Sequence, residues 1–421
     1  MLPKILIGIV LLVVAVMTFG FFTKDKFPQK QAPFGLNKVF PGNDYFADTA
    51  DLPSCGDQKE ILTYSHLNLS DFDEITPLGL LSPTAHTLPT AHLYFNIRKT
   101  VTGNDSSNPI KTDLIAPADI KITSIKWSEA INKPEWNDGA LVFGVCREFK
   151  AYFDHVGSFS DKIMKAYEQN PIKSCTDYTL SYPDPVGKVD YHLCQVSVDI
   201  EIKAGEKIGT AGGGGGQRVL DVGAFDKRIS PHQFANQSRW QDRQQMQYVV
   251  CTLDYFTAQI QTQMKERLPA QTCGEVVQDI PGTAMGVWVP PGTNYIEHEP
   301  PYLALAHDNI QPENLVFSMG ESGSKAGLAV GKYTYFPKNE GLVNRHFKDI
   351  KSDGSVSFPK ENSPTVYCFE TQDLYQSWKE AIPTRIIMDM PTPEKLRIQK
   401  LDAPSCGEGP WTMTNFVEFV R

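Results

Sequence analysis

Three histidines and one aspartate are the residues whose types could do chemistry together. His86 and His92 stand in SPTAHTLPTAHLYF, His155 stands in AYFDHVGS, and Asp221 stands in the strand-like segment VLDVGAF. Imidazole and carboxylate groups are ordinary zinc ligands, and such sites are often assembled from distant strands. We hypothesise that His86, His92 and Asp221 bind a metal ion, with His155 as base or hydrogen-bond donor. The alternative is that these histidines only pack in the core or lie on the surface.

Other chemistries find little support in the sequence. The five glycines 212–216 resemble a phosphate loop, but no Lys-Ser or Lys-Thr pair follows them, so we predict a β-hairpin tip. Neither a G-x-S-x-G elbow nor an H-E-x-x-H helix is present. The formal charge is -9 and no run of Lys and Arg occurs, which argues against a nucleic-acid partner.

The elements that must position these residues are mainly strands. A first unit over residues 72–268 shows alternating apolar and polar positions in several short segments. The predicted strands are 92–99, 119–127, 140–146, 150–156, 194–202 and 219–225. Two helices are predicted over 160–169 and 253–268; Ser160 is expected to cap the first, and an apolar stripe of the second, ending at Leu268, is expected in the core.

A second unit over residues 269–421 also predicts short strands. RIIMDM and KLRIQKL, separated by PTPE, are typical of a hairpin, and TNFVEFVR predicts a closing strand. We expect a small β-barrel or β-sandwich. Trp288, Tyr295 and Tyr302 either pack inside it or stack on sugars. A lipid or small-ligand carrier role for this unit rests on architecture alone.

The N-terminus carries a long apolar segment. Residues 5–22 contain no charge and are long enough to cross a bilayer, with Lys4 before them and Lys24 after them. Because bulky Phe residues stand where a signal peptidase needs small ones, we expect residues 1–22 to be an uncleaved membrane anchor. If the segment is a cleaved signal, the protein is secreted. Residues 23–71 are expected to form a linker and N-terminal extension.

The cysteines indicate on which side of the membrane the body lies. All eight follow the apolar segment, and an even number behind an export signal implies disulfides in an oxidising compartment. We therefore expect a periplasmic or cell-surface body. Cys175 with Cys194, and Cys368 with Cys406, are candidate pairs because they are near in sequence, although spacing does not fix the connectivity.

Three segments carry a family resemblance. DLIAPADIKITSIKW, KAYFDHVGSFS and VDIEIKAGEKIGTAGGGGG follow one another in the chain. In this order they resemble the GxxVxAPxxGxV, YxHLs and VxxGxxIGxxGxTG segments of lysostaphin-type zinc metallopeptidases, the duplicated hybrid motif family. The resemblance covers roughly residues 80–225 and implies a β-sheet core of that type. Lipoyl and biotinyl carriers share the strand pattern, but no modifiable Lys stands at a suitable tip.

The chain departs from that family at its catalytic motifs. His155 matches the YxH histidine, with Phe153 in place of the Tyr, whereas Thr90 stands where an H-x3-D motif starting at His86 needs Asp. No histidine occurs where H-x-H should follow the glycine loop; the chain reads Leu220-Asp221-Val222-Gly223. The loss of a metal ligand and a candidate base together predicts an inactive peptidase-like core.

Two functions follow as expectations. The first is a membrane-tethered protein, without a cofactor, whose inactive core binds or scaffolds a cell-envelope polymer or a protein ligand. The second is a divergent zinc-dependent peptidase, or other metal hydrolase, acting on cell-wall-like peptides. It requires His86, His92 and Asp221 to meet at one ion.

Overall fold

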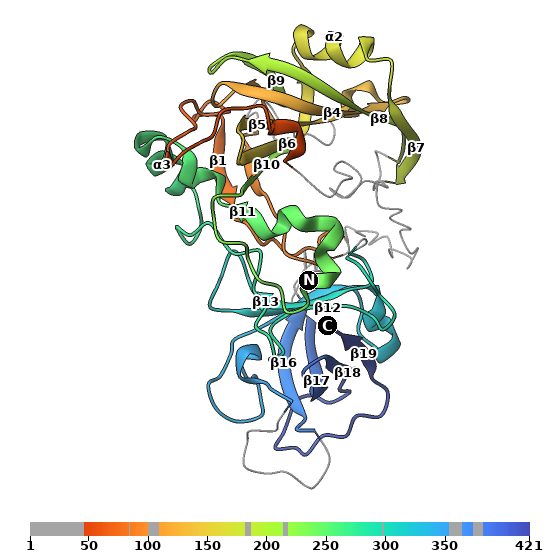
Figure 1. The fold of residues 1–421 in the computed structure, drawn as a ribbon. Coiled ribbons are helices and arrows are strands. Elements are labelled where there is room, and N and C mark those ends of the chain that lie inside the picture. Colours follow the sequence, from red (N-terminus) through yellow and green to blue (C-terminus); the bar gives the residue numbers. More distant parts are fainter. Residues whose placement is uncertain are drawn as a thin grey trace, which may run out of the picture.

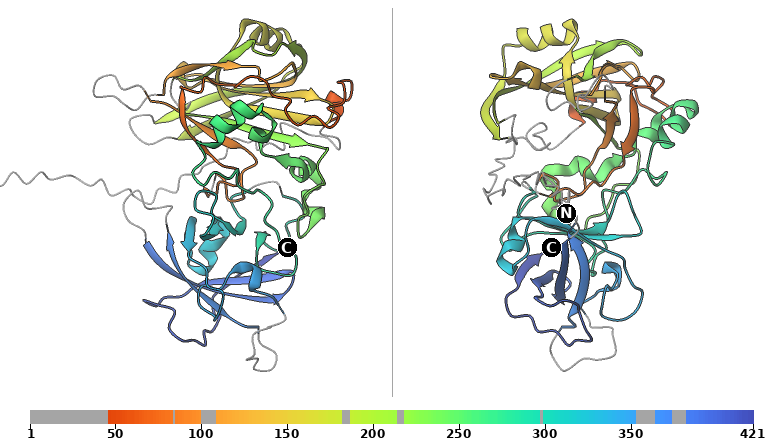
Figure 2. Two further views of the ribbon diagram at one scale, coloured as in Figure 1. Left: turned by 90° about the vertical axis from the view of Figure 1, so that its left-hand side faces the viewer. Right: turned by 180° about the vertical axis from the view of Figure 1, so that it is seen from behind.

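The fold was obtained as a computed structural model, which describes residues 46–83, 85–99, 109–181, 187–213, 218–296, 299–352, 364–373 and 382–421. The protein is mainly β, as its alternating segments predict. Two large antiparallel sheets stack along the long axis of the molecule, and the helix α2 covers the far end of the first (Figures 1 and 2). The strand and helix bounds of each sheet are given in the next paragraphs.

The first sheet holds the segments in which the four candidate residues stand. Its main path has the strand order β1-β2-β10-β6-β5-β4-β8-β7, and β3, β9 and β11 pair beside it. Its strands are β1 (Phe72–Thr76), β2 (Leu93–Ile97), β3 (Lys111–Ile115), β4 (Ile120–Ala130), β5 (Asp138–Cys146), β6 (Phe149–Phe159), β7 (Ser174–Ser181), β8 (Lys188–Ile202), β9 (Lys207–Gly212), β10 (Val219–Asp226) and β11 (Val249–Val250). All six predicted strands of this unit are confirmed, most of them longer than expected.

The helices are shorter than predicted. In the described ranges, the α-helices are α2 (Asp161–Gln169) and α3 (Ala258–Lys265), and the 3-10 helices are η1 (Ala47–Thr49), η2 (Pro134–Trp136), η3 (Gln237–Tyr248), η4 (Thr252–Tyr255), η5 (Glu321–Ala326) and η6 (Phe347–Asp349). Ser160 occupies the N-cap position of α2 but makes no side-chain cap bond, so that prediction is wrong. The apolar stripe is confirmed as core: Phe256, Met264 and Leu268 are buried.

The second sheet is a single antiparallel path that curls round on itself. Its strands are β12 (Gly286–Trp288), β13 (Leu303–His307), β14 (Leu315–Met319), β15 (Gly331–Tyr335), β16 (Tyr367–Asp373), β17 (Ile382–Thr392), β18 (Lys395–Lys400) and β19 (Val417–Val420). Mutual hydrogen bonds between Val289 and Val420 bring its two ends together, which makes it barrel-like. The predicted hairpin, β17 with β18, and the closing strand β19 are confirmed.

The aromatic residues of the second unit mostly pack inside. Trp288 is fully buried, with its indole nitrogen donating to the carbonyl of Ala284, and Tyr302 is buried too. Tyr295 is exposed. Tyr302, Ala304 and Ala306 belong to the core of the first unit, so the two sheets share a continuous apolar contact.

The glycine-rich segment is not the tip of a β-hairpin. It follows β9 and precedes β10, but among the described residues β9 pairs with β3 and β6, whereas β10 pairs with β2, β6 and β11. Glycines 214–216 themselves lie outside the described residues. The segment therefore connects two strands that do not pair with each other. One part of β6 pairs with β10, and the following part pairs with β9.

Residues 46–71, expected within the linker and extension, pack against the first sheet. Leu62, His66 and Leu67 are buried, and Cys55 is bonded to Cys146. The other disulfides join Cys251 to Cys273 and both predicted pairs, Cys175 to Cys194 and Cys368 to Cys406. Four disulfides agree with an extracytoplasmic location.

The expected membrane segment, residues 5–22, lies outside the described residues. Within the part of the chain that the structure describes, no helix is both long and apolar enough to cross a membrane.

Candidate functional site

A row of polar side chains crosses one face of the first sheet. Tyr94 of β2, Asp221 of β10, Asp154 of β6 and Lys126 of β4 follow one another through register partners, with Ala140 of β5 between the last two. Residues directly opposite on neighbouring strands point to the same face of a sheet. The row therefore places ionisable groups of β10, β6 and β4 in line with the hydroxyl of Tyr94 of β2, and Lys126 Nζ donates to Asp154 Oδ2 at 2.9 Å.

His155 lies beside this row because β6 changes partner at that residue. Along one edge, β6 pairs with β10 up to Asp154 and with β9 from Val156 onwards. Along the other edge, Asp154 and Val156 oppose consecutive residues of β5, so His155 is the extra residue of a bulge. Its φ of 64° lies in the left-handed region, which a residue with a side chain adopts at a cost in energy. The bulge turns His155 towards Asp221.

Three of the predicted residues contact one another. His92 Nε2 lies 3.2 Å from Asp221 Oδ2, and His155 Nε2 lies 3.7 Å from the same oxygen. His155 Nδ1 is 3.1 Å from Asp138 Oδ2, and His92 Nδ1 is 3.0 Å from the hydroxyl of Tyr152. Each imidazole is thus oriented by a second group on the side away from Asp221, which is how proteins fix histidines that act on a metal or a proton.

His86 adds a third imidazole, which comes from a loop. Its ring centre is 5.7 Å from that of His92. The loop is tied to the second unit, since the backbone nitrogen of Leu88 donates to Glu299 Oε2 at 3.1 Å, and Arg243 lies 3.7 Å from Glu299 Oε1. The loop that carries His86 is therefore positioned by contacts with both units, through Glu299 of the second and Arg243 of the first.

Burial and charge set the protonation of the cluster. Burial lowers the pKa of His86 and lowers that of His92 well below its ordinary value, so both imidazoles are neutral near pH 7. Burial also raises the pKa of Asp221 to about 7, against the opposing effect of His155. For His155, burial favours the neutral form, but the charges of Asp138 and Asp221 outweigh it and raise the pKa to about 10. Because 36% of the His155 side chain is exposed, solvent weakens this effect.

Within the part of the chain that the structure describes, two buried atoms of the His92 and Asp221 side chains have no hydrogen-bond partner. These are His92 Nε2 and Asp221 Oδ1, on residues that are 7% and 5% exposed. Asp221 Oδ2 is close to His92 Nε2, yet the two atoms are not aligned as a hydrogen bond. Leaving such atoms without partners costs free energy, on the order of 1–3 kcal/mol each, so they mark a place where a ligand would be stabilising.

The side chains are not all in place for one ion. Among the described residues, the ligand atoms of Asp138, Asp154 and His155 lie within 4.8 Å of one another, but His86, His92 and Asp221 do not form such a set. Since Lys126 already neutralises Asp154, the first group is a poor cation site. In the other group, His92 and Asp221 already lie at a distance suited to two ligands of one ion. The His86 ring must move to become the third ligand.

The structure thus brings His86, His92, His155 and Asp221 into one cluster, while their roles remain predictions. Sequence reasoning missed Asp138, Tyr152 and Glu299 as neighbours of the cluster. Tyr152 stands in the predicted strand 150–156 and Asp138 two residues before the predicted strand 140–146, but only the register of β5, β6 and β10 shows which histidine each contacts. Glu299 lies more than 200 residues from the loop it holds, and no local signal indicates it.

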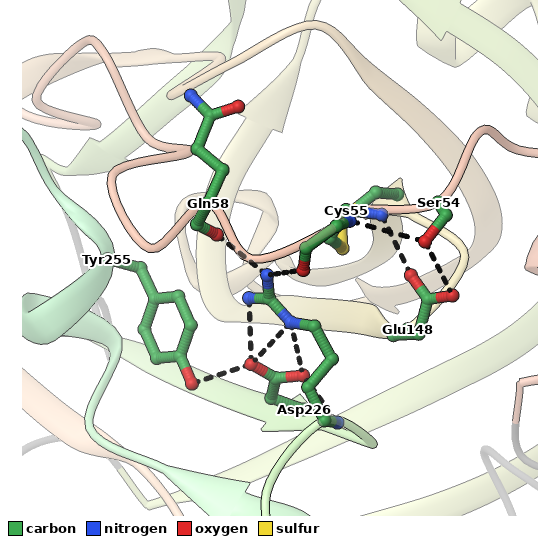
Figure 3. A network of polar contacts seen from close by, with 9 residues as sticks. Ser54, Cys55, Gln58, Glu148, Asp226 and Tyr255 are labelled. Carbon is green, nitrogen blue, oxygen red and sulfur yellow. Dashed lines mark hydrogen bonds and ion pairs between the residues drawn. A yellow bond between two sulfur atoms is a disulfide. The ribbon is translucent and has the colours of Figure 1, made fainter.

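A separate hollow lies away from the cluster, and the polar groups that line it have structural roles. A cavity of about 830 Å³ is lined partly by Asp226, Arg228 and Tyr255. Arg228 donates to both carboxylate oxygens of Asp226 and to the carbonyls of Gly56 and Gln58, while the Tyr255 hydroxyl donates to Asp226 (Figure 3). These hydrogen bonds attach residues 56–58 to the end of β10. The polar groups of Arg228 and Asp226 are therefore engaged in holding the structure together.

No family model, no characterised protein and no solved structure matches this chain.

Proposed function

We propose that this protein is a divergent metal-dependent hydrolase, with zinc held by His86, His92 and Asp221. The observation that carries the proposal is the pair of buried atoms without hydrogen bonds, His92 Nε2 and Asp221 Oδ1. Two ligands of a tetrahedral zinc ion lie about 3.3 Å apart, close to the 3.2 Å between His92 Nε2 and Asp221 Oδ2. Neutral imidazoles are the form that binds metal, and burial keeps both histidines neutral.

His155 is proposed to move protons at this site. Zinc, when bound, supplies a polarised water molecule as nucleophile. The His155 side chain is 36% exposed, against 9% for His92 and 7% for Asp221, so substrate reaches these three from the His155 side. Its imidazolium, held by Asp138, is placed to donate a proton to the leaving group. Catalytic zinc sites use three protein ligands and keep the fourth position for water, which His86, His92 and Asp221 would allow.

The substrate and the location are part of the proposal. Four disulfides support a body outside the cytoplasm. Residues 5–22 would tether it to the membrane, and the three segments that resemble lysostaphin-type peptidases favour cell-wall-like peptides as substrate.

A second candidate function is a metal-free binding module for a cell-envelope polymer or protein. It is favoured by the charge balance of the cluster, in which Asp154 faces Lys126 and His155 lies between Asp138 and Asp221. A network of this kind is stable without an ion, because each charge has an opposite neighbour.

Zinc content and peptide hydrolysis separate the two candidates. The full chain, purified in detergent and incubated with zinc, is expected to hold about one equivalent, and His92→Ala and Asp221→Asn are expected to lose it. His155→Gln should retain zinc but lose hydrolysis of crosslinked peptidoglycan. His307→Gln, which changes a histidine of the second unit that contacts the Pro312 carbonyl, is the control. If the folded parent binds no zinc, the hydrolase is excluded and the binding module remains.

A further inference from the structure

An exposed disulfide lies on the ribbon formed by β7 and β8, far along the sheet from β10. In the register of these strands, Cys175 is directly opposite Cys194, and Asp177 is directly opposite His192. Residues two apart on a strand point to the same side. The disulfide, the histidine and the aspartate therefore share one face of the ribbon.

The histidine connects the carboxylate to one sulfur. His192 Nε2 is 3.1 Å from Cys194 Sγ, and His192 Nδ1 is 2.6 Å from Asp177 Oδ1. An imidazole held by a carboxylate and directed at sulfur is the arrangement that stabilises a thiolate in cysteine chemistry. Here the sulfur is oxidised, so the arrangement acts only when the disulfide opens.

The two sulfurs differ in access. Of the eight cysteines, all of which the structure describes, Cys175 alone is exposed, whereas Cys194 is 3% exposed. β7 is an edge strand of the sheet, so nothing pairs beyond it in the described chain. A nucleophile therefore reaches Cys175, and Cys194 is the sulfur that leaves.

We propose that Cys175–Cys194 is a thiol–disulfide exchange site for an external dithiol. A thiolate of the dithiol attacks Cys175 Sγ, the Cys175–Cys194 bond breaks, and its electron pair goes to Cys194 as thiolate. His192 donates a hydrogen bond to that thiolate, and Asp177 holds the imidazole. The second thiol then attacks the mixed disulfide, so the dithiol is oxidised to a disulfide and the protein holds two reduced cysteines.

The remaining disulfides lack this combination. Cys368 with Cys406 and Cys55 with Cys146 are buried, and Cys251 with Cys273 is half-buried. They provide internal controls in the same molecule, since an attacking thiolate needs access to a sulfur atom.

The experiment follows each disulfide during reduction of the folded full chain by dithiothreitol at pH 7. Free thiols are alkylated at intervals and quantified by mass spectrometry. We expect Cys175–Cys194 to open first, about tenfold faster than Cys368–Cys406. The reason is that His192 stabilises the Cys194 thiolate as it leaves and that Cys175 is exposed to the attacking thiolate. His192→Gln should slow the opening about tenfold and Asp177→Asn severalfold.

The controls distinguish chemistry from loosened structure. Asp190→Asn removes an equal charge two register positions from His192, where the Asp190 carboxylate accepts from the Thr179 hydroxyl, and should leave the rate unchanged. If His192 merely stabilised the ribbon, His192→Gln would speed the opening. That result, an unchanged rate, or opening of Cys175–Cys194 no faster than Cys368–Cys406 would each overturn the proposal.

Discussion

At the scale of single residues, His155 combines an unfavourable backbone conformation with a charged side chain. Its left-handed φ is imposed by the bulge at which β6 changes partner. Strain of this kind persists when the surroundings hold it, and it is frequent at functional sites. The backbone cost and the side-chain role can be separated by choosing replacements that differ in their tolerance of positive φ.

We predict that His155→Val is less stable than His155→Asn by about 1–2 kcal/mol, because Asn tolerates the left-handed region and a β-branched residue does not. Both variants lose the contacts with Asp138 and Asp221, so their difference reports the backbone. Denaturant unfolding of the two proteins measures it. Equal midpoints and slopes would show that residue 155 is not held in the left-handed region.

A second residue-scale prediction concerns His66, a core histidine away from the cluster. Its ring packs edge-on to Phe95, 4.3 Å between centres, and burial lowers its pKa to about 3. The unfolded chain takes up this proton near pH 6.5 but the folded protein does not, so stability is lost as the pH falls from 6.5 towards 3. The full effect is about 5 kcal/mol.

His66→Leu should remove this part of the acid sensitivity. Unfolding free energies are measured from pH 7 to pH 4, and the value of the parent minus that of the variant is expected to fall as the pH falls. Parallel curves would mean that His66 titrates alike in both states.

At the scale of elements, the site depends on how closely β10 approaches β6. Gly223 lies opposite Tyr152, and a Cβ at position 223 would lie 2.2 Å from Cε1 of that ring. The Tyr152 hydroxyl in turn contacts His92 Nδ1. The missing side chain at position 223 therefore lets the tyrosine reach the histidine.

We predict that Gly223→Ala lowers stability by about 1–3 kcal/mol and weakens zinc binding, since it displaces the tyrosine. Tyr152→Phe is the matched variant, because it removes the hydroxyl without crowding; it should weaken zinc binding about tenfold with little loss of stability. Calorimetric titration with zinc and thermal unfolding test both. Full zinc affinity in Gly223→Ala would contradict the coupling.

At the scale of the whole molecule, the second unit holds a loop of the first. Glu299 accepts from the backbone of Leu88 and lies beside Arg243, and it is the charge from the second unit that acts on His86. The apolar contact shared by the two units keeps this carboxylate in place. The barrel-like sheet thus has a role at the cluster as well as a core of its own.

Glu299→Gln should weaken zinc binding about tenfold, because the loop that carries His86 loses a charged acceptor. Glu418→Gln, which breaks an exposed pair with Lys395 on the second sheet, is the control and should bind zinc as the parent does. Zinc titrations of both variants decide this. An unchanged affinity in Glu299→Gln would show that the second unit does not affect the site.

Local patterns predicted much of the fold and part of the cluster. Alternation indicated β2, β4, β5, β6, β8 and β10 and the hairpin of β17 with β18, since burial of one face follows directly from side-chain type. Residue chemistry alone named the four members of the cluster. The pairing of β6 with two strands, the bulge at His155 and the contact of Glu299 depend on long-range register, which no local pattern fixes. The wrong hairpin at the glycine segment has the same origin.

The zinc content of the full chain tests the central claim most directly. Elemental analysis after incubation with zinc and removal of the excess is predicted to give about one equivalent in the parent and in His307→Gln, and none in His92→Ala or Asp221→Asn. A folded parent without zinc, or a parent whose zinc persists in both variants, would contradict a metal site at His92 and Asp221.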